Sequence, residues 1–334
     1  MDNSDLSATR FFFELGPNQI LDAVETFGYR CTGRCLALNS MENRVYEVEI
    51  EGDSFRTPSD RFRVVKFYRP GRWSAEQIGE EHQFLSDLIE YEIPVVAPLK
   101  SKDGGTLQRV KDIDIFYSVF PKIGGRIYNE LNEDELLRIG RLLGRLHNVG
   151  ATKPAQHRLA LTPESYGTNN LSTLEELDVL PDSISARYKE VVTAICKISS
   201  ELFKKVPTQR IHGDCHLGNL LWCDTSPFWV DFDDMVSGPK VQDLWLLTPN
   251  RDSESEYHRE LLLEGYEQFS KFDRSSLRLI EPLRALRMIR FSAWIAVRWK
   301  DPAFPRAFPT FGTERYWGEE LLGLVDILSI IQKF

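Results

Sequence analysis

Apolar and polar positions alternate through much of the first 120 residues. Residues 44–50 (RVYEVEI) show this pattern, and residues 62–68 (FRVVKFY) follow after a polar stretch that contains Gly52 and Pro58. A period of two is typical of strands with one buried face, so the two segments predict a long β-hairpin. The apolar run at 113–120 predicts a third strand.

Two segments of the same region have helical spacing instead. Residues 17–27 place their apolar side chains on one helical face, and Gly28 follows as a stop. A second helix is predicted from about residue 75 to residue 91, with Ser74 as its N-cap. The first 120 residues are therefore predicted to form an antiparallel sheet with one or two helices.

The pattern changes after Pro121-Lys122-Ile123-Gly124-Gly125, which we interpret as a hinge. Apolar residues beyond it recur at helical spacing. The predicted helices span residues 133–147, 183–206 and 281–300, with a packed terminal helix near 321–331.

This change predicts an α+β, bilobal fold. The expected β-rich N-terminal lobe spans residues 1–121, and the expected helical C-terminal lobe spans residues 122–334. A chain of 334 residues is long enough for two such lobes.

Composition narrows the class of protein. Hydrophobic residues make up 42% and charged residues 27% of the chain, as in ordinary globular proteins. The net charge of −9 and the lack of a dense basic stripe argue against nucleic-acid binding. The acidic N-terminus, the absence of a long apolar run and the odd count of five cysteines favour a cytoplasmic protein with free thiols and no membrane partner. We expect a monomer.

The most informative motif is His212-Gly213-Asp214, with Asn219 five residues after Asp214 and Asp231 twelve further on. Protein kinases have an Asp followed five residues later by Asn, and then an Asp on a short strand. Here Asp214 is suited to accept the proton of an attacking hydroxyl. Asn219 and Asp231 offer the oxygen ligands that Mg²⁺ prefers.

A phosphate-binding cation is expected on the sheet. Lys66 projects opposite its apolar neighbours in the predicted strand, as the strand lysine of a kinase does. The helix after Ser74 supplies Glu80 and Glu81 as partners. We favour Glu81, because Leu85 and Leu88 follow it at helical spacing on a face that can pack inward.

Side chains of zinc-binding types also lie near the motif; they are His212, Cys215, His216 and Cys223. Their spacing lacks the paired positions of zinc fingers, and a zinc site would leave Asp214 and Asn219 unexplained. We therefore prefer phosphoryl transfer. His147 is interpreted as a satisfied core histidine, and Asp243 as a structural residue that could hydrogen-bond the loop around Asp214.

The motif from His212 to Asn219, together with Val230-Asp231, resembles the aminoglycoside phosphotransferase and choline kinase superfamily, which shares the protein-kinase fold. From about residue 16 to residue 320 the chain is similar, more specifically, to the bacterial stress response kinase A family. The similar blocks are Asn43-Arg44-Val45-Tyr46, Val64-Val65-Lys66-Phe67-Tyr68-Arg69-Pro70, Glu80-Glu81-His82-Gln83-Phe84, Val241-Gln242-Asp243-Leu244-Trp245 and Asp301-Pro302-Ala303-Phe304-Pro305.

The resemblance implies a cytoplasmic serine/threonine protein kinase that uses ATP and Mg²⁺ in a stress response, with a nucleotide-binding N-terminal lobe and a catalytic, substrate-binding C-terminal lobe. It implies that Asp214 and Asp231 are catalytic, that Asn219 and Asp231 bind the metal, and that Lys66 and its partner Glu81 serve the nucleotide. The phosphate-covering loop would be residues 38–43, with Ser40 in contact with nucleotide. This loop lacks the glycine-rich pattern of ordinary protein kinases.

Two other functions stay open. A small-molecule kinase, acting on an aminoglycoside, choline or homoserine, would use the same Asp and metal ligands. An inactive scaffold would not need Lys66, Asp214, Asn219 and Asp231 together. Because only a short segment separates Asp231 from Asp243, we expect no regulatory activation loop there.

Overall fold

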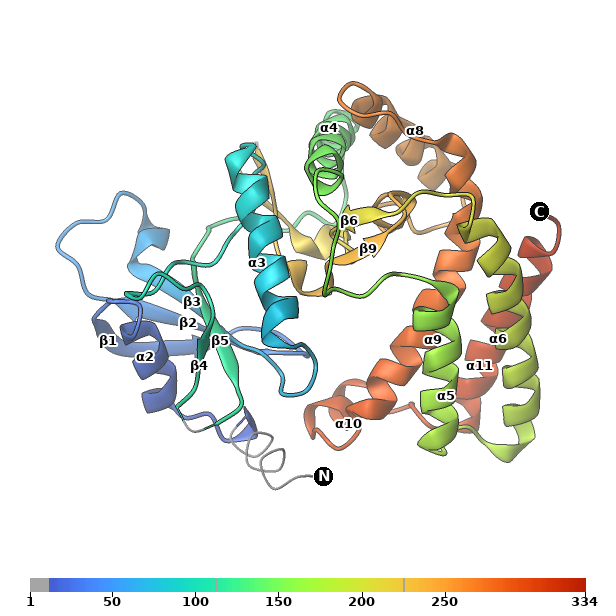
Figure 1. The fold of residues 1–334 in the computed structure, drawn as a ribbon, viewed down its shortest axis with the longest axis horizontal. Coiled ribbons are helices and arrows are strands. Elements are labelled where there is room, and N and C mark those ends of the chain that lie inside the picture. Colours follow the sequence, from blue (N-terminus) through green and yellow to red (C-terminus); the bar gives the residue numbers. More distant parts are fainter. Residues whose placement is uncertain (1–11, 112, 225) are drawn as a thin grey trace. The chain divides into compact units, whose positions relative to one another are not determined.

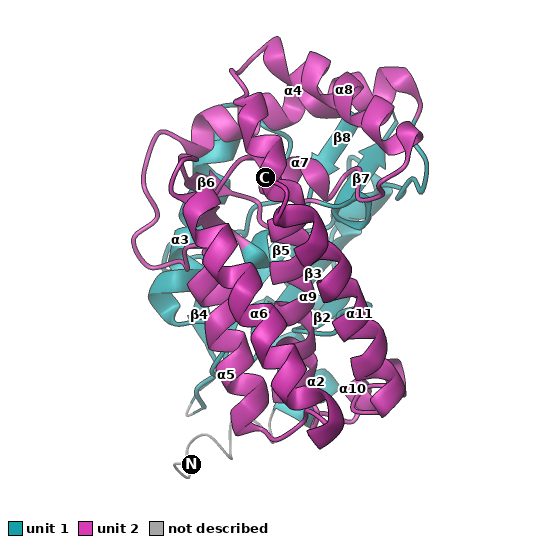
Figure 2. Ribbon diagram, turned by 90° about the vertical axis from the view of Figure 1, so that its right-hand side faces the viewer, with its two compact units in different colours: residues 1–131, 216–234 teal, residues 132–215, 235–334 magenta. Residues whose placement is uncertain are grey.

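The computed structural model describes residues 12–111, 113–224 and 226–334. The chain divides into two compact units, each built from two separate stretches (Figure 2). Unit 1 comprises residues 1–131 and 216–234, and unit 2 comprises residues 132–215 and 235–334. The lobe boundary at residue 121 stays a prediction.

A five-stranded antiparallel sheet forms the centre of unit 1 (Figure 1). The strands, in their order across the sheet, are β1 (Cys31–Ala37), β2 (Arg44–Ile50), β3 (Phe62–Phe67), β5 (Phe116–Pro121) and β4 (Gln108–Arg109). The predicted hairpin is confirmed, since β2 pairs with β3 in a register that sets Val45 opposite Lys66. On its other side β3 pairs with β5, with Lys66 opposite Ser118. Lys66 therefore lies on a strand that is paired along both edges.

The sheet contains two strands that were not predicted, β1 and β4, and its third predicted strand begins later than expected. β1 was not predicted, because its sequence CTGRCLA shows no clean alternation and the strand lies at the sheet edge. The third predicted strand begins at Phe116 rather than at residue 113. Its first residues form a turn instead, in which the Val110 N–H donates to the Ile115 carbonyl at 2.8 Å.

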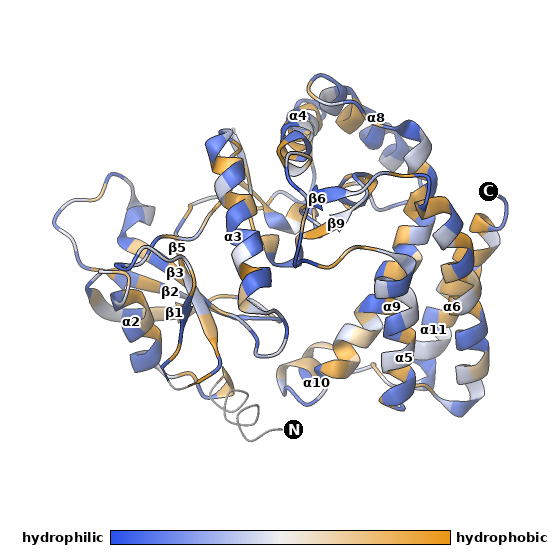
Figure 3. Cartoon of the chain, viewed as in Figure 1, coloured by the Kyte–Doolittle hydropathy of each residue, from blue (hydrophilic) through white to orange (hydrophobic). Residues whose placement is uncertain are grey.

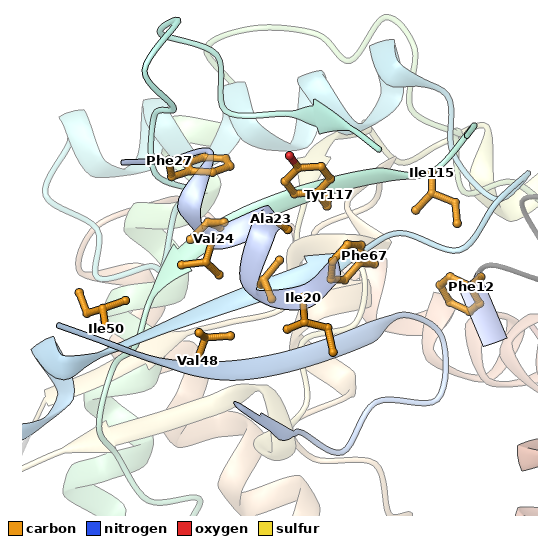
Figure 4. Close-up of a cluster of buried hydrophobic side chains, with 12 residues drawn as sticks. Phe12, Ile20, Ala23, Val24, Phe27, Val48, Ile50, Phe67, Ile115 and Tyr117 are labelled. Carbon is orange, nitrogen blue, oxygen red and sulfur yellow. The ribbon is translucent and has the colours of Figure 1, made fainter. Parts of the chain in front are cut away.

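The core of unit 1 lies between the sheet and helix α2 (Pro17–Glu25). Ile20 and Val24 of this helix are buried with Val48, Phe67 and Tyr117 of the strands (Figure 4). Apolar burial of this kind contributes roughly 1.5–3 kcal/mol for each large side chain. One face of the sheet that carries Lys66 is therefore packed against α2.

Helix α3 (Ala75–Glu90) confirms the second predicted helix of this region. The Ser74 hydroxyl accepts a hydrogen bond from the Gln77 N–H at 3.3 Å, as expected of an N-cap. The inward face of α3 buries Glu81 among apolar residues such as Ile78 and Leu85.

A second stretch of chain, residues 216–234, completes unit 1. Its elements are the 3₁₀ turns η3 (Leu217–Asn219) and η4 (Phe232–Asp234) and the antiparallel pair β7 (Leu220–Cys223) and β8 (Ser226–Trp229). Single bridges join Trp229 to Val95 and Trp222 to Arg126. These contacts place Asn219 and Asp231 in the same unit as Lys66.

Unit 2 is mostly helical. Its larger helices are α4 (Glu133–Gly150), α5 (Asn169–Glu176), α6 (Asp182–Phe203), α8 (Ser253–Glu267), α9 (Ile280–Val297) and α11 (Glu314–Ile331). Shorter elements are η2 (Glu164–Thr168), α7 (Val241–Trp245), η5 (Arg274–Leu279), α10 (Ala303–Ala307) and the paired strands β6 (Gln209–Ile211) and β9 (Val236–Gly238). The predicted helices are confirmed, although the last begins at residue 314 rather than near 321. In unit 1, the turn η1 spans Pro58–Arg61.

The helices of unit 2 carry both hydrophilic and hydrophobic residues along their length (Figure 3). Helices α6, α9 and α11 pack together, and α4 packs on α8. The second contact is close enough that a Cβ added at Gly140 would lie 2.1 Å from the Leu262 carbonyl oxygen. Within the described ranges, none of the helices is long and apolar enough to cross a membrane.

Candidate active site

Lys66 lies at the centre of a charged network in unit 1. Its Nζ is 2.8 Å from Asp233 Oδ1, 3.6 Å from Asp231 Oδ1 and 4.0 Å from Glu81 Oε1. Burial alone would lower the pKa of Lys66, but the carboxylates of Asp233 and Glu81 outweigh it and hold the pKa well above its ordinary value. Lys66 therefore stays charged and points at a group of carboxylates.

The structure brings Glu81 to Lys66, as the sequence analysis expected, but Asp233 lies closer. Glu81 is buried on α3, whereas Asp233 is buried in the turn η4 that follows Asp231. The sequence analysis did not assign Asp233 to Lys66. The sequence signal for this contact was Asp233 itself, a second carboxylate two residues after Asp231 in the run Asp231-Phe232-Asp233-Asp234. In a tight turn, side chains two residues apart can reach the same cation, here Lys66.

Asp231 has an unusual backbone conformation. Its φ of +60° lies in the left-handed region, which non-glycine residues enter mainly at turns and functional sites. Its carboxyl side chain is 58% exposed, in contrast to the buried Asp233. The left-handed turn thus separates two neighbouring carboxylates, leaving one accessible and directing the other to Lys66.

Asn219 is tied to the segment that carries Asp231. The Val230 N–H donates to the Asn219 carbonyl oxygen at 3.0 Å, and the Asn219 N–H donates to the His216 carbonyl at 2.9 Å. One amide oxygen and one accessible carboxylate match the few protein ligands that Mg²⁺ takes alongside phosphate and water. These two residues therefore fit a magnesium ion. No cluster of three or more His, Cys, Asp or Glu side chains suited to a metal occurs in the described part of the chain.

Arg72 was not singled out from the sequence, yet it holds several parts of unit 1 together. Its guanidinium contacts Asp233 Oδ2 at 2.6 Å, Asp234 Oδ1 at 2.8 Å and Glu42 Oε2 at 3.4 Å. Burial would lower the pKa of Arg72, but the three carboxylates raise it above its ordinary value. Asp233 is thus shared by two buried cations, Lys66 and Arg72.

Neighbouring contacts fix the loop at residues 38–43. Arg69 donates to the carbonyls of Glu42, at 2.9 Å, and Met41, at 3.1 Å, and its own N–H donates to the Asn43 side chain at 3.1 Å. Ser40 Oγ accepts from the Asn43 N–H at 3.3 Å. The loop is therefore shaped by Arg69 and Arg72 without the glycine-rich pattern, and the nucleotide contact of Ser40 stays a prediction.

The loop that carries Asp214 belongs to unit 2 and is shaped by Asp243. The two carboxylate oxygens of Asp243 accept the backbone N–H groups of His212 and Gly213, each at 2.8 Å. Gly213 has a φ of +86°, which explains why glycine stands where protein kinases have arginine. The expected hydrogen bond between Asp243 and this loop is confirmed.

His147 supports the same arrangement from α4. It is fully buried, with Nε2 3.1 Å from Asp243 Oδ2 and Nδ1 2.9 Å from the Tyr266 hydroxyl. Burial lowers the pKa of His147 in spite of the hydrogen bond to Asp243, so the ring is neutral. A neutral ring donates from Nε2 to Asp243 and accepts at Nδ1 from Tyr266, which confirms the interpretation as a satisfied core histidine.

The carboxylate of Asp214 forms an ion pair with an arginine of α9. Arg287 Nη1 lies 2.7 Å from Asp214 Oδ1. Arg287 was not predicted from the sequence, because it stands 73 positions further along the chain, with no motif around it. Asp214 and Asn219 are only five residues apart in sequence but belong to different units.

Comparisons with known proteins support a phosphotransferase. A family model described as "Phosphotransferase enzyme family" matches residues 35–280. Stress response kinase A of Escherichia coli K12 is 39% identical over 324 residues, which cover 96% of this chain and 95% of that protein. A protein of Salmonella typhimurium LT2 named serine/threonine protein kinase RdoA is 38% identical over 96% of this chain and 95% of that protein.

Solved structures show the same fold. A microcompartment-associated aminopropanol kinase has a TM-score of 0.68 at 18% identity and covers 95% of this chain and 97% of its own. An amicoumacin kinase in complex with AMP-PNP and Ca²⁺ has a TM-score of 0.67 at 19% identity and covers 88% of this chain and 91% of its own. At these identities the likeness concerns the fold alone, and it confirms the predicted kinase-like α+β class.

Proposed function

Because this chain belongs to the stress response kinase A family of phosphotransferases, we propose that it transfers the γ-phosphate of ATP to a serine or threonine hydroxyl of a protein. The observation that carries the proposal is the likeness over nearly the whole chain, 96%, to relatives named as kinases, one of them as a serine/threonine protein kinase. A role in a bacterial stress response is proposed on the same ground. A location in the cytoplasm and a monomeric state stay predictions.

The proposed nucleotide residues lie in unit 1. Lys66, fixed between Asp233 and Glu81, offers a buried positive charge to the ATP phosphates, and the loop with Ser40 offers hydrogen-bond donors. Asn219 and Asp231 would hold Mg²⁺, whose charge neutralises the phosphate oxygens when it is bound. Asp233 and Arg72 position Lys66 and the 38–43 loop.

Asp214 is the proposed proton acceptor. As the acceptor oxygen forms its bond to the γ-phosphorus and the bond to the ADP oxygen breaks, the hydroxyl proton passes to the Asp214 carboxylate. The hydrogen bonds from His212 and Gly213 to Asp243 fix the backbone that presents this carboxylate. Arg287 holds one oxygen of this carboxylate by an ion pair at 2.7 Å, which limits the rotation of the side chain.

The contact with Arg287 also bears on the choice between acceptors. A cationic small molecule, such as an aminoglycoside or choline, is best bound beside uncompensated carboxylates. Here a guanidinium lies 2.7 Å from the proposed proton acceptor, and Asp233 and Asp234 are already paired with Arg72 or Lys66. These contacts favour a protein, or a zwitterion such as homoserine whose carboxylate can meet Arg287, over a small molecule with only positive charge, with the protein as first choice.

The test is phosphorylation of a generic protein substrate with γ-labelled ATP and Mg²⁺. We compare the unmodified protein with Asp214→Asn, which keeps the shape and removes the base, and with Asp224→Asn, an exposed carboxylate in the β7–β8 turn, as control. Loss of a general base costs about 10²–10⁴-fold, and we expect this loss only in Asp214→Asn. Equal labelling by all three proteins refutes the role of Asp214. ATP turnover that appears only with small hydroxyl compounds replaces the protein acceptor with the alternative.

A further inference from the structure

One face of α9 presents a continuous strip of arginine and aromatic side chains. Arg287, Phe291, Trp294 and Arg298 follow one another at helical spacings of four, three and four residues, and so share a face. The rings of Phe291 and Trp294 stack at 5.5 Å with an interplanar angle of 21°, and the Arg298 guanidinium lies 5.4 Å above the Trp294 ring. Phe291 is 44% exposed, which is unusual for a phenylalanine.

The strip begins at the proposed proton acceptor. Arg287, its first member, is the residue that contacts Asp214 at 2.7 Å. At a rise of about 1.5 Å per residue, the eleven positions to Arg298 extend roughly 16 Å along the helix. An extended peptide covers that length with about five residues.

Helix α10 packs against the aromatic part of the strip, where its Phe304 is fully buried. Phe304 packs on Trp294 with ring centroids 4.8 Å apart, and Phe308 packs on Phe291 at 5.6 Å. The exposed residues Lys300 and Arg306 lie in this same segment. The apolar centre of the strip is thus followed by further positive charge.

The charge of this segment is opposite to that of the chain. Residues 284–306 contain six basic side chains and one acidic side chain, whereas the whole chain has a net charge of −9. Three of the six basic residues, Arg287, Lys300 and Arg306, are exposed. The single acid, Asp301, is buried and accepts the Ala303 N–H at 3.0 Å. A surface of this kind attracts acidic partners.

We propose that this strip, defined by Arg287, Phe291, Trp294 and Arg298 with Lys300 and Arg306 beyond, docks an acidic segment of the acceptor protein. The inference rests on the proposed function and adds a substrate class to it. The segment carries aspartate or glutamate, and an aromatic or aliphatic side chain for Phe291, within about five residues of the phosphorylated serine or threonine.

A positional-scanning library of serine and threonine peptides, phosphorylated by the full chain with ATP and Mg²⁺, tests the proposal. The unmodified protein is expected to select acidic residues within about five positions of the acceptor. Lys300→Glu/Arg306→Glu is expected to raise KM for the best acidic peptide about tenfold and to leave kcat and the KM for ATP unchanged. Phe291→Ala is expected to raise KM for peptides with an aromatic residue and not for peptides without one.

Lys197→Glu/Lys205→Glu provides the matched control. It makes the same charge change at exposed lysines on and just after α6, in the same unit, and is expected to leave the KM for peptides unchanged. Peptide phosphorylation without acidic selection, or equal KM values for the two double variants, overturns the docking strip and leaves the protein kinase intact. If no peptide is labelled while ATP turnover with small hydroxyl compounds depends on Asp214, the proposed function itself fails.

Discussion

The two units hold their candidate residues in opposite ways. In unit 1, Lys66 and Arg72 are fixed by carboxylates, and Asp233 contacts both cations, at 2.8 Å and 2.6 Å. In unit 2, Asp243 fixes the loop before Asp214 by accepting two backbone N–H groups, with a neutral His147 behind it. The cations of unit 1 are therefore held by side-chain charge, whereas the backbone before Asp214 in unit 2 is held by hydrogen bonds.

The difference follows from the chemistry each region is proposed to perform. A cation that meets phosphate has to stay charged, so it is surrounded by carboxylates that raise its pKa. A loop that presents one carboxylate has to keep its shape, so its backbone is bonded inside a buried, tightly packed region. Removing the carboxylate that fixes the loop in unit 2, Asp243, is therefore expected mainly to lower the stability of the fold. Removing the carboxylate that fixes the cations in unit 1, Asp233, is expected mainly to lower the affinity for nucleotide.

The largest effect is expected for Asp243→Ala. The change leaves the N–H groups of His212 and Gly213 and the His147 ring without their buried acceptor, which costs about 3 kcal/mol or more of unfolding free energy. Urea unfolding measures it. Asp252→Ala, which removes the exposed N-cap of α8, serves as control and is expected to cost about 1 kcal/mol. Equal losses in the two variants contradict the special role of Asp243.

Gly140→Ala tests the close packing of unit 2. The new Cβ would meet the Leu262 carbonyl at 2.1 Å, so α4 and α8 have to separate, at a cost of about 1–3 kcal/mol. Gly318→Ala in α11 meets no atom within 4 Å and is expected to stabilise the protein by about 0.5–1 kcal/mol. Thermal unfolding of both variants gives the comparison, and a Gly140→Ala protein as stable as the parent shows that α4 and α8 can separate freely.

Glu320→Gln tests a buried carboxyl in unit 2. Burial raises the pKa of Glu320 from 4.5 to about 7, and the Ser292 hydroxyl lies 3.0 Å from its Oε1. A raised carboxyl pKa favours the neutral native form, so its contribution to stability is fully present below about pH 4.5 and is lost as the pH rises through about 7.

The unfolding free energy of the unmodified protein is therefore expected to fall by on the order of 2 kcal/mol between pH 5 and pH 8 because of Glu320. Glu320→Gln is expected not to show this fall. Urea unfolding at both pH values measures the difference. Glu319→Gln, at an exposed carboxylate paired with Arg315, is the control and is expected to follow the parent. Parallel pH profiles for Glu320→Gln and the parent are the contrary result.

The smallest of these effects is expected on nucleotide binding, for Asp233→Asn in unit 1. It removes the shared negative charge from Lys66 and Arg72, so KM for ATP is expected to rise about tenfold, equivalent to about 1.4 kcal/mol. Asp234→Asn, which weakens only the contact with Arg72, is expected to change KM less. Equal KM values for Asp233→Asn and the parent would show that Glu81 and Asp231 suffice to hold Lys66.

Local pattern predicted much of the fold. The β2–β3 hairpin, the cap at Ser74 and the helices α4, α6 and α9 follow from periodicity and capping chemistry, which act over a few residues. β1 was not predicted, because an edge strand needs no alternation of its own when its partner β2 supplies the hydrogen bonds.

The sequence by itself determined the family, the order of Lys66, Asp214, Asn219 and Asp231, and the strands and loops that carry them, since these depend on residue type and short spacing. Only the tertiary structure decided that Asp233 lies closer to Lys66 than Glu81 does, and that Arg287 meets Asp214. The physical reason is that ion pairs are selected by differences of about one ångström between groups far apart in the chain. Such distances are set by the packing of whole elements, and no local pattern encodes them.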